Sequence, residues 1–248
     1  MDYYDLLIEF HLNSHRLAPG SDDHTMQAFD LTGFSRNEHL KILDIGCGTG
    51  AQTLALLHHT NAEITAVDNS ISLLVKMEER AVDAGFENRI SPLFGNMSEI
   101  PLDEATFDLI WAEGSVYNIG FENGLRQFSK FLKPNGMMVI SELVWISENR
   151  PKEIEDYWNE NYPGIGTIIE KEEQISNNGM RLIDSFILPE SCWVDNYYEP
   201  NSRRTKEFVS KFSSQEGVND FLAFEKSEYE AYLKYRDYYS YAFFIIQC

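Results

Sequence analysis

Two spacings of apolar residues divide this chain into its elements. Short apolar runs closed by turn residues predict buried strands, and apolar residues three or four positions apart predict helices that pack on one face. Over the middle of the chain the two kinds alternate, which is typical of a parallel sheet covered by helices. The strands are expected within 40–50 and at 63–68, 90–94, 107–111 and 137–144, and the helices at 51–60, 70–84 and 122–132.

The segments on either side have a different character. The beginning predicts an amphipathic helix over 1–17, which the pair Pro19-Gly20 ends. A second helix is expected over 22–31, where Ser21 can cap its first turn. After residue 145, helices are expected at 151–161, 170–178, 202–212 and 215–236, and strands at 180–188 and 239–246.

The glycine-rich stretch after the first strand predicts a binding site for a nucleotide-like ligand. Three glycines stand at alternate positions, Gly46, Gly48 and Gly50, and a helix begins at Ala51. Glycine permits unusual backbone angles and lets a ligand lie against bare main chain. The free N–H groups and the positive dipole end of the helix point into the same space. A ligand is therefore expected at the carboxyl end of the first strand.

A carboxylate at the end of the second strand adds to this site. Residues 64–67 form an apolar run that ends on Asp68. In a parallel sheet the tips of neighbouring strands lie side by side, so we expect Asp68 beside the glycine turn. There it can accept hydrogen bonds from both hydroxyl groups of a ribose.

The acidity of the chain restricts its partners. The chain has 248 residues and a formal net charge of −20, and its longest basic cluster, Arg203-Arg204-Thr205-Lys206, is brief. Such a surface repels phosphate groups, so we expect a neutral or cationic small molecule as partner and no nucleic acid. No apolar run approaches the ~20 residues of a membrane span. The acidic start, Met1-Asp2-Tyr3-Tyr4-Asp5, lacks the basic region of a signal peptide.

Cysteine usage favours a reducing compartment. Cys47, Cys192 and Cys248 have no paired spacing that would indicate a disulfide framework or a metal site. We therefore expect a cytoplasmic protein without a bound metal.

Several segments together resemble one enzyme family. Residues 43–50 are similar to motif I of the class I S-adenosylmethionine-dependent methyltransferases, and Asp68 matches the acidic residue after their second strand. Further similar segments follow in the family's order: Gly95-Asn96-Met97 with Ile100-Pro101, Phe107–Trp111 and Leu132–Ile140. The chain most resembles the small-molecule branch that includes ubiquinone and menaquinone methyltransferases.

The resemblance implies the fold and the division of the chain. The fold would be α/β: a Rossmann-like, seven-stranded, mostly parallel sheet with helices on both faces and an antiparallel last strand. Residues 1–36 are expected to form a helical cap, because a pocket at this place in the sheet usually has a cover. Its two helices either cover the sheet edge or close over the cofactor, with Tyr3, Tyr4, His11 and His15 facing the pocket. Residues 37–248 would form the methyltransferase domain, in which 146–179 is an insertion before strand six that shapes the substrate site.

The resemblance also implies contacts to S-adenosylmethionine. The glycine turn would admit the methionyl part, Asp68 would bind the ribose, and the segment after the third strand would lie beside the adenine. Many relatives have Asp where this chain has Asn96, so that contact differs here. The cofactor-binding residues expected on this basis are Asp44, Gly46, Cys47, Gly48, Gly50, Gln52, Thr53, Asp68, Asn69, Asn96, Met97 and Glu113.

The expected reaction is an in-line transfer of a methyl group to a small molecule. A general base is needed only if the acceptor keeps its proton. No residue is assigned this role, and the candidates are Glu113, Tyr117, His11 and His15. The acceptor atom is left open, and a homodimer is a further expectation.

Two alternatives fit part of the same pattern. Gly46, Gly48 and Ala51 also satisfy the looser dinucleotide motif G-x-G-x-x-G/A, and Asp68 would serve an NAD(P)-dependent oxidoreductase equally well. A protein that binds S-adenosylmethionine without transferring its methyl group would carry the same motifs.

Overall fold

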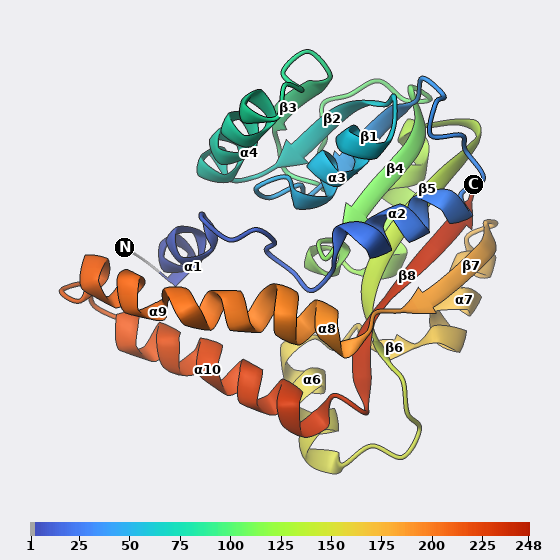
Figure 1. The fold of residues 1–248 in the computed structure, drawn as a ribbon. Helices are drawn as coiled ribbons and strands as arrows, with labels where there is room; N and C mark the ends of the chain where they lie inside the picture. The colour runs from blue at the N-terminus through green and yellow to red at the C-terminus, as the bar shows by residue number, and fades with distance from the viewer. Residues whose placement is uncertain (1–2) are drawn as a thin grey trace.

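A single twisted sheet runs through the protein, whose computed structural model describes residues 3–248 (Figure 1). Its strand order is β3-β2-β1-β4-β5-β8-β7, and a short strand, β6, pairs separately with β5. All pairs are parallel except those of β8, which is antiparallel to both neighbours. The strands are β1 (Lys41–Ile45), β2 (Glu63–Asp68), β3 (Ile90–Phe94), β4 (Phe107–Glu113), β5 (Leu132–Trp145), β6 (Gly166–Thr167), β7 (Arg181–Ile187) and β8 (Tyr239–Gln247).

This topology confirms the predicted α/β class. The mostly parallel sheet, the fourth strand beside the first and the antiparallel last strand are all present. The two-residue β6 is an addition to the seven strands expected from the sequence.

Helices cover both faces of the sheet. One face packs against α2 (Asp22–Leu31), α3 (Ala51–His59) and α4 (Ile71–Asp83), and the other against α5 (Phe121–Phe128) and α7 (Ile168–Asn177). In α4 the buried residues Leu73, Leu74, Met77 and Ala81 recur at helical spacing, and the Ser70 side chain caps the helix.

A helical cap stands over the carboxyl ends of the parallel strands (Figure 1). It combines α1 (Tyr3–His11) with α9 (Glu199–Phe212) and α10 (Val218–Tyr235), which lie side by side. These three helices share a small core of their own, made by Leu6, Phe10, Phe208, Val218 and Phe221. The cap is therefore built from two segments that are far apart in the sequence.

The predicted N-terminal cap of residues 1–36 is divided in the structure. Only α1 joins the cap, whereas α2 packs against α3 and β8, and Phe29 is completely buried in the main core. The helix predicted over 1–17 ends at His11, and its first two residues lie outside the described part of the chain. After His11 the buried side chains of Ser14 and Arg16 hydrogen-bond to Asn201 and Glu113, so this segment follows the cavity wall.

The helix predicted over 122–132 is also shorter than expected. α5 ends at Phe128, a 3₁₀ turn spans Ser129–Phe131, and β5 begins at Leu132. Lys133 donates to Asp108 at the start of β4 (2.6 Å), which holds this segment beside that strand.

The remaining helices surround the far end of the cavity. They are α6 (Lys152–Asn161), the short α8 (Glu190–Trp193) and a π-helical turn, η3 (Val194–Tyr198), which leads directly into α9. Among residues 3–248 no helix is long and apolar enough to cross a membrane.

Candidate functional site

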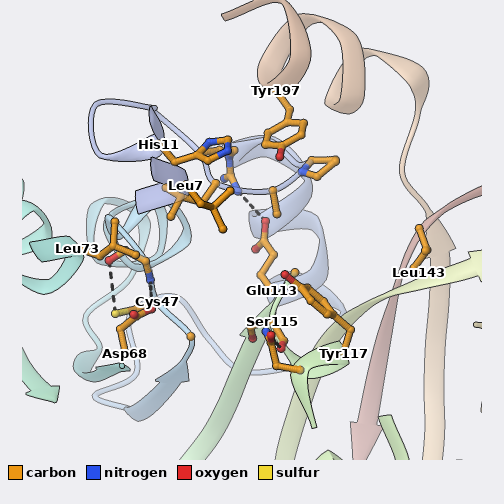
Figure 2. Close-up of a pocket in the computed structure, with 18 of the residues that line it drawn as sticks. Leu7, His11, Cys47, Asp68, Leu73, Glu113, Ser115, Tyr117, Leu143 and Tyr197 are labelled. Carbon is orange, nitrogen blue, oxygen red and sulfur yellow. Dashed lines mark hydrogen bonds and ion pairs between the residues drawn. The ribbon is translucent and has the colours of Figure 1, made fainter. Parts of the chain in front are cut away.

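A cavity of about 800 Å³ opens where the carboxyl ends of β1, β2 and β4 meet the cap. The glycine turn and Asp68 form one end, and aromatic side chains from α6, α8, η3 and α10 form the other. Figure 2 shows Cys47 and Asp68 on one side of the cavity, Tyr117 and Tyr197 on the other, and Glu113 between them.

The turn after β1 requires glycine at two positions, where φ is positive and a neighbouring side chain lies close. Gly46 has a φ of +78°, and a Cβ there would lie 2.4 Å from the Cβ of Ser115. Gly50 has a φ of +80°, and a Cβ there would lie 2.4 Å from the Cγ of Met77 in α4. Gly46 and Gly48 line the cavity, whereas Gly50 does not. Gly46 therefore lets Ser115 pack against the turn at the cavity wall, and Gly50 lets α4 pack closely.

Asp68 lies directly beside this turn. Its Oδ2 accepts a hydrogen bond from the N–H of Gly48 (2.9 Å), and its Oδ1 accepts one from the N–H of Ser70 (2.9 Å). Burial raises the pKa of Asp68, and these two N–H groups counteract the rise. Each carboxylate oxygen has a further lone pair, so Asp68 can accept hydroxyl groups from the cavity that it lines. Tyr4 of the cap donates to Asn69 (3.1 Å) and partly covers this end.

The structure brings most of the predicted site residues to the cavity. Those that line it are Gly46, Cys47, Gly48, Gln52, Asp68, Asn69, Asn96, Met97, Glu113, Tyr117 and His11. Asp44, Gly50, Thr53 and His15 do not line it.

Asp44 and Thr53, which are predicted to bind the cofactor, lie underneath the turn and do not line the cavity. Both are completely buried. Asp44 accepts hydrogen bonds from Thr53 Oγ1 (2.5 Å) and Gln52 Nε2 (3.2 Å), which join β1 to α3. Burial raises the pKa of Asp44 to about 7. These side chains support the turn from below, and Gln52 alone of the three reaches the cavity wall.

His15 also differs from its prediction. Its side chain is exposed, while its backbone carbonyl accepts from Arg80 (3.3 Å). The same guanidinium donates to the carbonyl of Thr49 (2.8 Å). The N-terminal segment is thus tied to the glycine turn through its main chain, because the helix that would have turned His15 inward ends four residues earlier.

Glu113 is buried between the two ends of the cavity and is fully engaged. It accepts from Arg16 Nη1 (2.6 Å), Thr25 Oγ1 (3.0 Å) and Trp111 Nε1 (3.1 Å). Its two oxygens are thus occupied by side chains of the protein, which hold Glu113 in place between the two ends of the cavity.

Arg16 lines the cavity and was missed in the sequence. It is 4% exposed, and its Nη2 donates to Asp22 (2.9 Å) and Thr25 (3.1 Å). A lone arginine in a segment without regular spacing gives no signal that distinguishes it from a surface residue.

The far end of the cavity is aromatic. The rings that line it are Tyr157, Trp158, Tyr162, Trp193, Tyr197, Tyr198, Phe224 and Tyr241. Tyr117 is 43% exposed, and Figure 2 shows its ring turned toward this space. His11 stacks on Tyr197, with ring centroids 5.9 Å apart.

Two acidic residues of α10, Glu225 and Glu228, also line this end. They were missed in the sequence, although Phe221, Glu225, Glu228 and Tyr232 are spaced four, three and four residues apart. That spacing places both acids on one helix face with two buried aromatic residues, which is the signal that identifies them.

The predicted insertion, residues 146–179, contributes α6 and Tyr162 to the cavity. The segment between β7 and β8 contributes at least as many side chains, so the prediction was too narrow. Behind Tyr162 lies a buried pair: its hydroxyl donates to Glu142, whose Oε1 is 3.7 Å from Lys171 Nζ. Burial raises the pKa of Glu142 to about 7 and lowers that of Lys171.

Comparisons with known proteins agree with this arrangement. A family model described as a methyltransferase domain matches residues 36–201. The chain is 32% identical over 123 residues to a demethylmenaquinone methyltransferase of Bacillus subtilis. This match covers 48% of this chain and 50% of that protein. The chain is also 27% identical over 129 residues to the methyltransferase GfsG of Streptomyces halstedii. This match covers 52% of this chain and 46% of that protein.

Among solved structures, a SAM-dependent methyltransferase of Geobacter sulfurreducens in complex with S-adenosyl-L-homocysteine matches with a TM-score of 0.86. The match covers 98% of this chain and 97% of that one at 16% identity, which shows a shared fold. The chain spans about half or less of the length of the curated relatives it matches.

Proposed function

The chain belongs to the methyltransferase domain family, and from this premise we propose that it is an enzyme that moves a methyl group from S-adenosylmethionine to a small organic acceptor. The single observation that carries the proposal is the glycine turn in hydrogen-bond contact with Asp68 at the edge of an open cavity. The demethylmenaquinone methyltransferase among its relatives and the S-adenosyl-L-homocysteine complex with the same fold support the cofactor and a small-molecule acceptor.

The residues at this end of the cavity fit the cofactor. Gly46 presents its main chain at the cavity wall, where a Cβ would collide with Ser115, and Asp68 has carboxylate lone pairs for two ribose hydroxyl groups. Asn69, Asn96 and Met97 line the region beside Asp68, where an adenine would lie. Arg16 and Gln52 line the cavity and carry N–H donors for the carboxylate of the methionyl part.

The chemistry requires little from the protein beyond position. When bound, the cofactor supplies an activated methyl group, which forms a bond to an acceptor lone pair as its bond to sulfur breaks and the sulfur keeps the electron pair. The protein's own residues hold the two reactants in line and exclude water, which is catalysis by proximity. The cap and the aromatic walls perform the second task. Tyr117 and His11 stay proposed acceptor-side residues.

Calorimetry with the full chain tests the proposal. We expect S-adenosylmethionine to bind and NAD to bind at least ~10-fold more weakly. Asp68→Ala should weaken S-adenosylmethionine binding by roughly 10- to 100-fold, because it removes charge-assisted hydrogen bonds. Asp83→Asn, at the exposed end of α4, is the matched control. Binding of NAD in preference would support an oxidoreductase instead.

Turnover separates an enzyme from a protein that only binds the cofactor. Transfer of a radiolabelled methyl group to a panel of metabolites would support catalysis. The homodimer stays a prediction, and so does the cytoplasmic location, which the three free cysteines support.

A further inference from the structure

The aromatic end of the cavity carries two carboxyl groups, Glu225 and Glu228, with which no Lys or Arg side chain among the described lining residues pairs. Arg16 is the one Lys or Arg side chain among the described residues that line the cavity, and it is already paired with Glu113 and Asp22. Within residues 3–248 the side chain of Glu228 has no hydrogen-bond or ion-pair partner. Glu225 has one contact, 3.8 Å from Nε2 of His11.

Glu228 lies among aromatic rings. Burial raises the pKa of Tyr157, Tyr197 and Tyr198, and the negative charge of Glu228 adds to the rise at each of them. The charge of Glu228 also adds to the raised pKa of Tyr117, which lines the same cavity. Its charge is therefore felt by rings from α6, η3 and the loop after β4.

A partly buried carboxylate without a partner is unfavourable, and a cation is the group that would compensate it. Burial and the neighbouring Glu225 raise the pKa of Glu228 to about 7, which is the expected response of such a group when no cation is present. Aromatic faces attract the same kind of partner, because the face of the ring is negative.

We propose, building on the proposed function, that this end of the cavity binds a protonated or quaternary nitrogen of the methyl acceptor, with Glu228 as its counter-ion and the surrounding rings as its walls. Phosphorylated or carboxylated acceptors would be repelled by Glu225 and Glu228. A neutral acceptor would leave Glu228 without a partner. The acceptor is thus an organic ammonium compound.

A matched pair of probes tests this inference directly. Choline carries a quaternary ammonium group, and 3,3-dimethylbutan-1-ol is its neutral isostere. Binding is measured by calorimetry and by the fluorescence of Trp158 and Trp193, which line the site. The full chain is used with and without saturating S-adenosylhomocysteine. We expect choline to bind roughly 10-fold more tightly than the alcohol.

Variants of α10 assign the preference to one side chain. Glu228→Gln keeps the shape and removes the charge, so it should bring the affinity for choline down to that for the alcohol. Glu230→Gln, on the exposed side of the same helix, should leave the preference unchanged. Trp158→Leu should weaken choline binding several-fold more than it weakens binding of the alcohol.

Equal affinities for the two probes, binding of neither, or an unchanged preference in Glu228→Gln would overturn the inference. The affinity for S-adenosylhomocysteine is measured in the same samples. Loss of that binding would contradict the proposed function, while the choline preference without cofactor would still decide the inference.

Discussion

Replacing Asp44 by Asn should change how the stability of the protein depends on pH. Asp44 is completely buried beneath the glycine turn, and burial raises its pKa from 3.8 to about 7. A raised pKa means that the folded protein holds the proton more tightly than the unfolded chain. The contribution of Asp44 to the free energy of unfolding is therefore fully present at pH values below its pKa in the unfolded chain, and it is lost as the pH rises through about 7.

The size of the effect follows from the pKa. A rise from 3.8 to about 7, at about 1.4 kcal/mol per pKa unit, corresponds to about 4 kcal/mol of unfolding free energy lost at alkaline pH. Asn has the same shape and no charge, and its amide can keep both hydrogen bonds, with Gln52 donating to it and Thr53 accepting from it. The variant should therefore escape this loss.

Urea unfolding of both proteins between about pH 4 and about pH 8 measures the difference. The stability of Asp44→Asn relative to the natural chain should increase by about 4 kcal/mol across this range. Glu142 and Glu228 also have raised pKa values, but they are present in both proteins and cancel in the difference. Thr53→Val removes a donor to the ionised form, so it should destabilise the protein more at alkaline than at acid pH. A difference that does not vary with pH would contradict the raised pKa of Asp44 and the burial that causes it.

Three further changes test neighbouring parts of the account. Gly46→Ala should abolish measurable binding of S-adenosylmethionine in calorimetry, because its Cβ would lie 2.4 Å from Ser115; Gly33→Ala, at a similar φ with nothing within 4 Å, should leave that binding intact. Arg16→Met should lower the free energy of unfolding by roughly 3–5 kcal/mol in urea titrations, since it leaves Glu113 buried without its cation. Lys171→Met should also lower the free energy of unfolding by roughly 3–5 kcal/mol in urea titrations, because Glu142 would lose its buried partner. Stabilities equal to that of the natural chain would contradict the described ion pairs.

Much of the cofactor end could be predicted because its signals are local. The glycines, the strand before them and Asp68 at the tip of the next strand lie in short segments, and a parallel sheet brings such tips together. Asp44 stands two residues before Gly46, and its position below the turn also follows from the sequence. How completely Thr53 and Gln52 enclose it there depends on the packing of α3 against β1, which the local pattern does not show.

The cap and the acceptor end could not be predicted in the same way. They depend on the packing of α1 against α9 and α10. About 200 residues of the chain separate α1 from these two helices. The spacing of Glu225 and Glu228 with buried aromatic residues was visible, but only the fold shows that this helix face closes a cavity. The same holds for Arg16, whose partner Glu113 lies on β4.

A crystal structure with S-adenosylhomocysteine tests the central claim most directly. The account predicts that both ribose hydroxyl groups lie within about 3 Å of the carboxylate oxygens of Asp68, against the bare main chain of Gly46 and Gly48, with Asp44 out of contact. A ligand bound elsewhere, or one whose ribose does not touch Asp68, would contradict it.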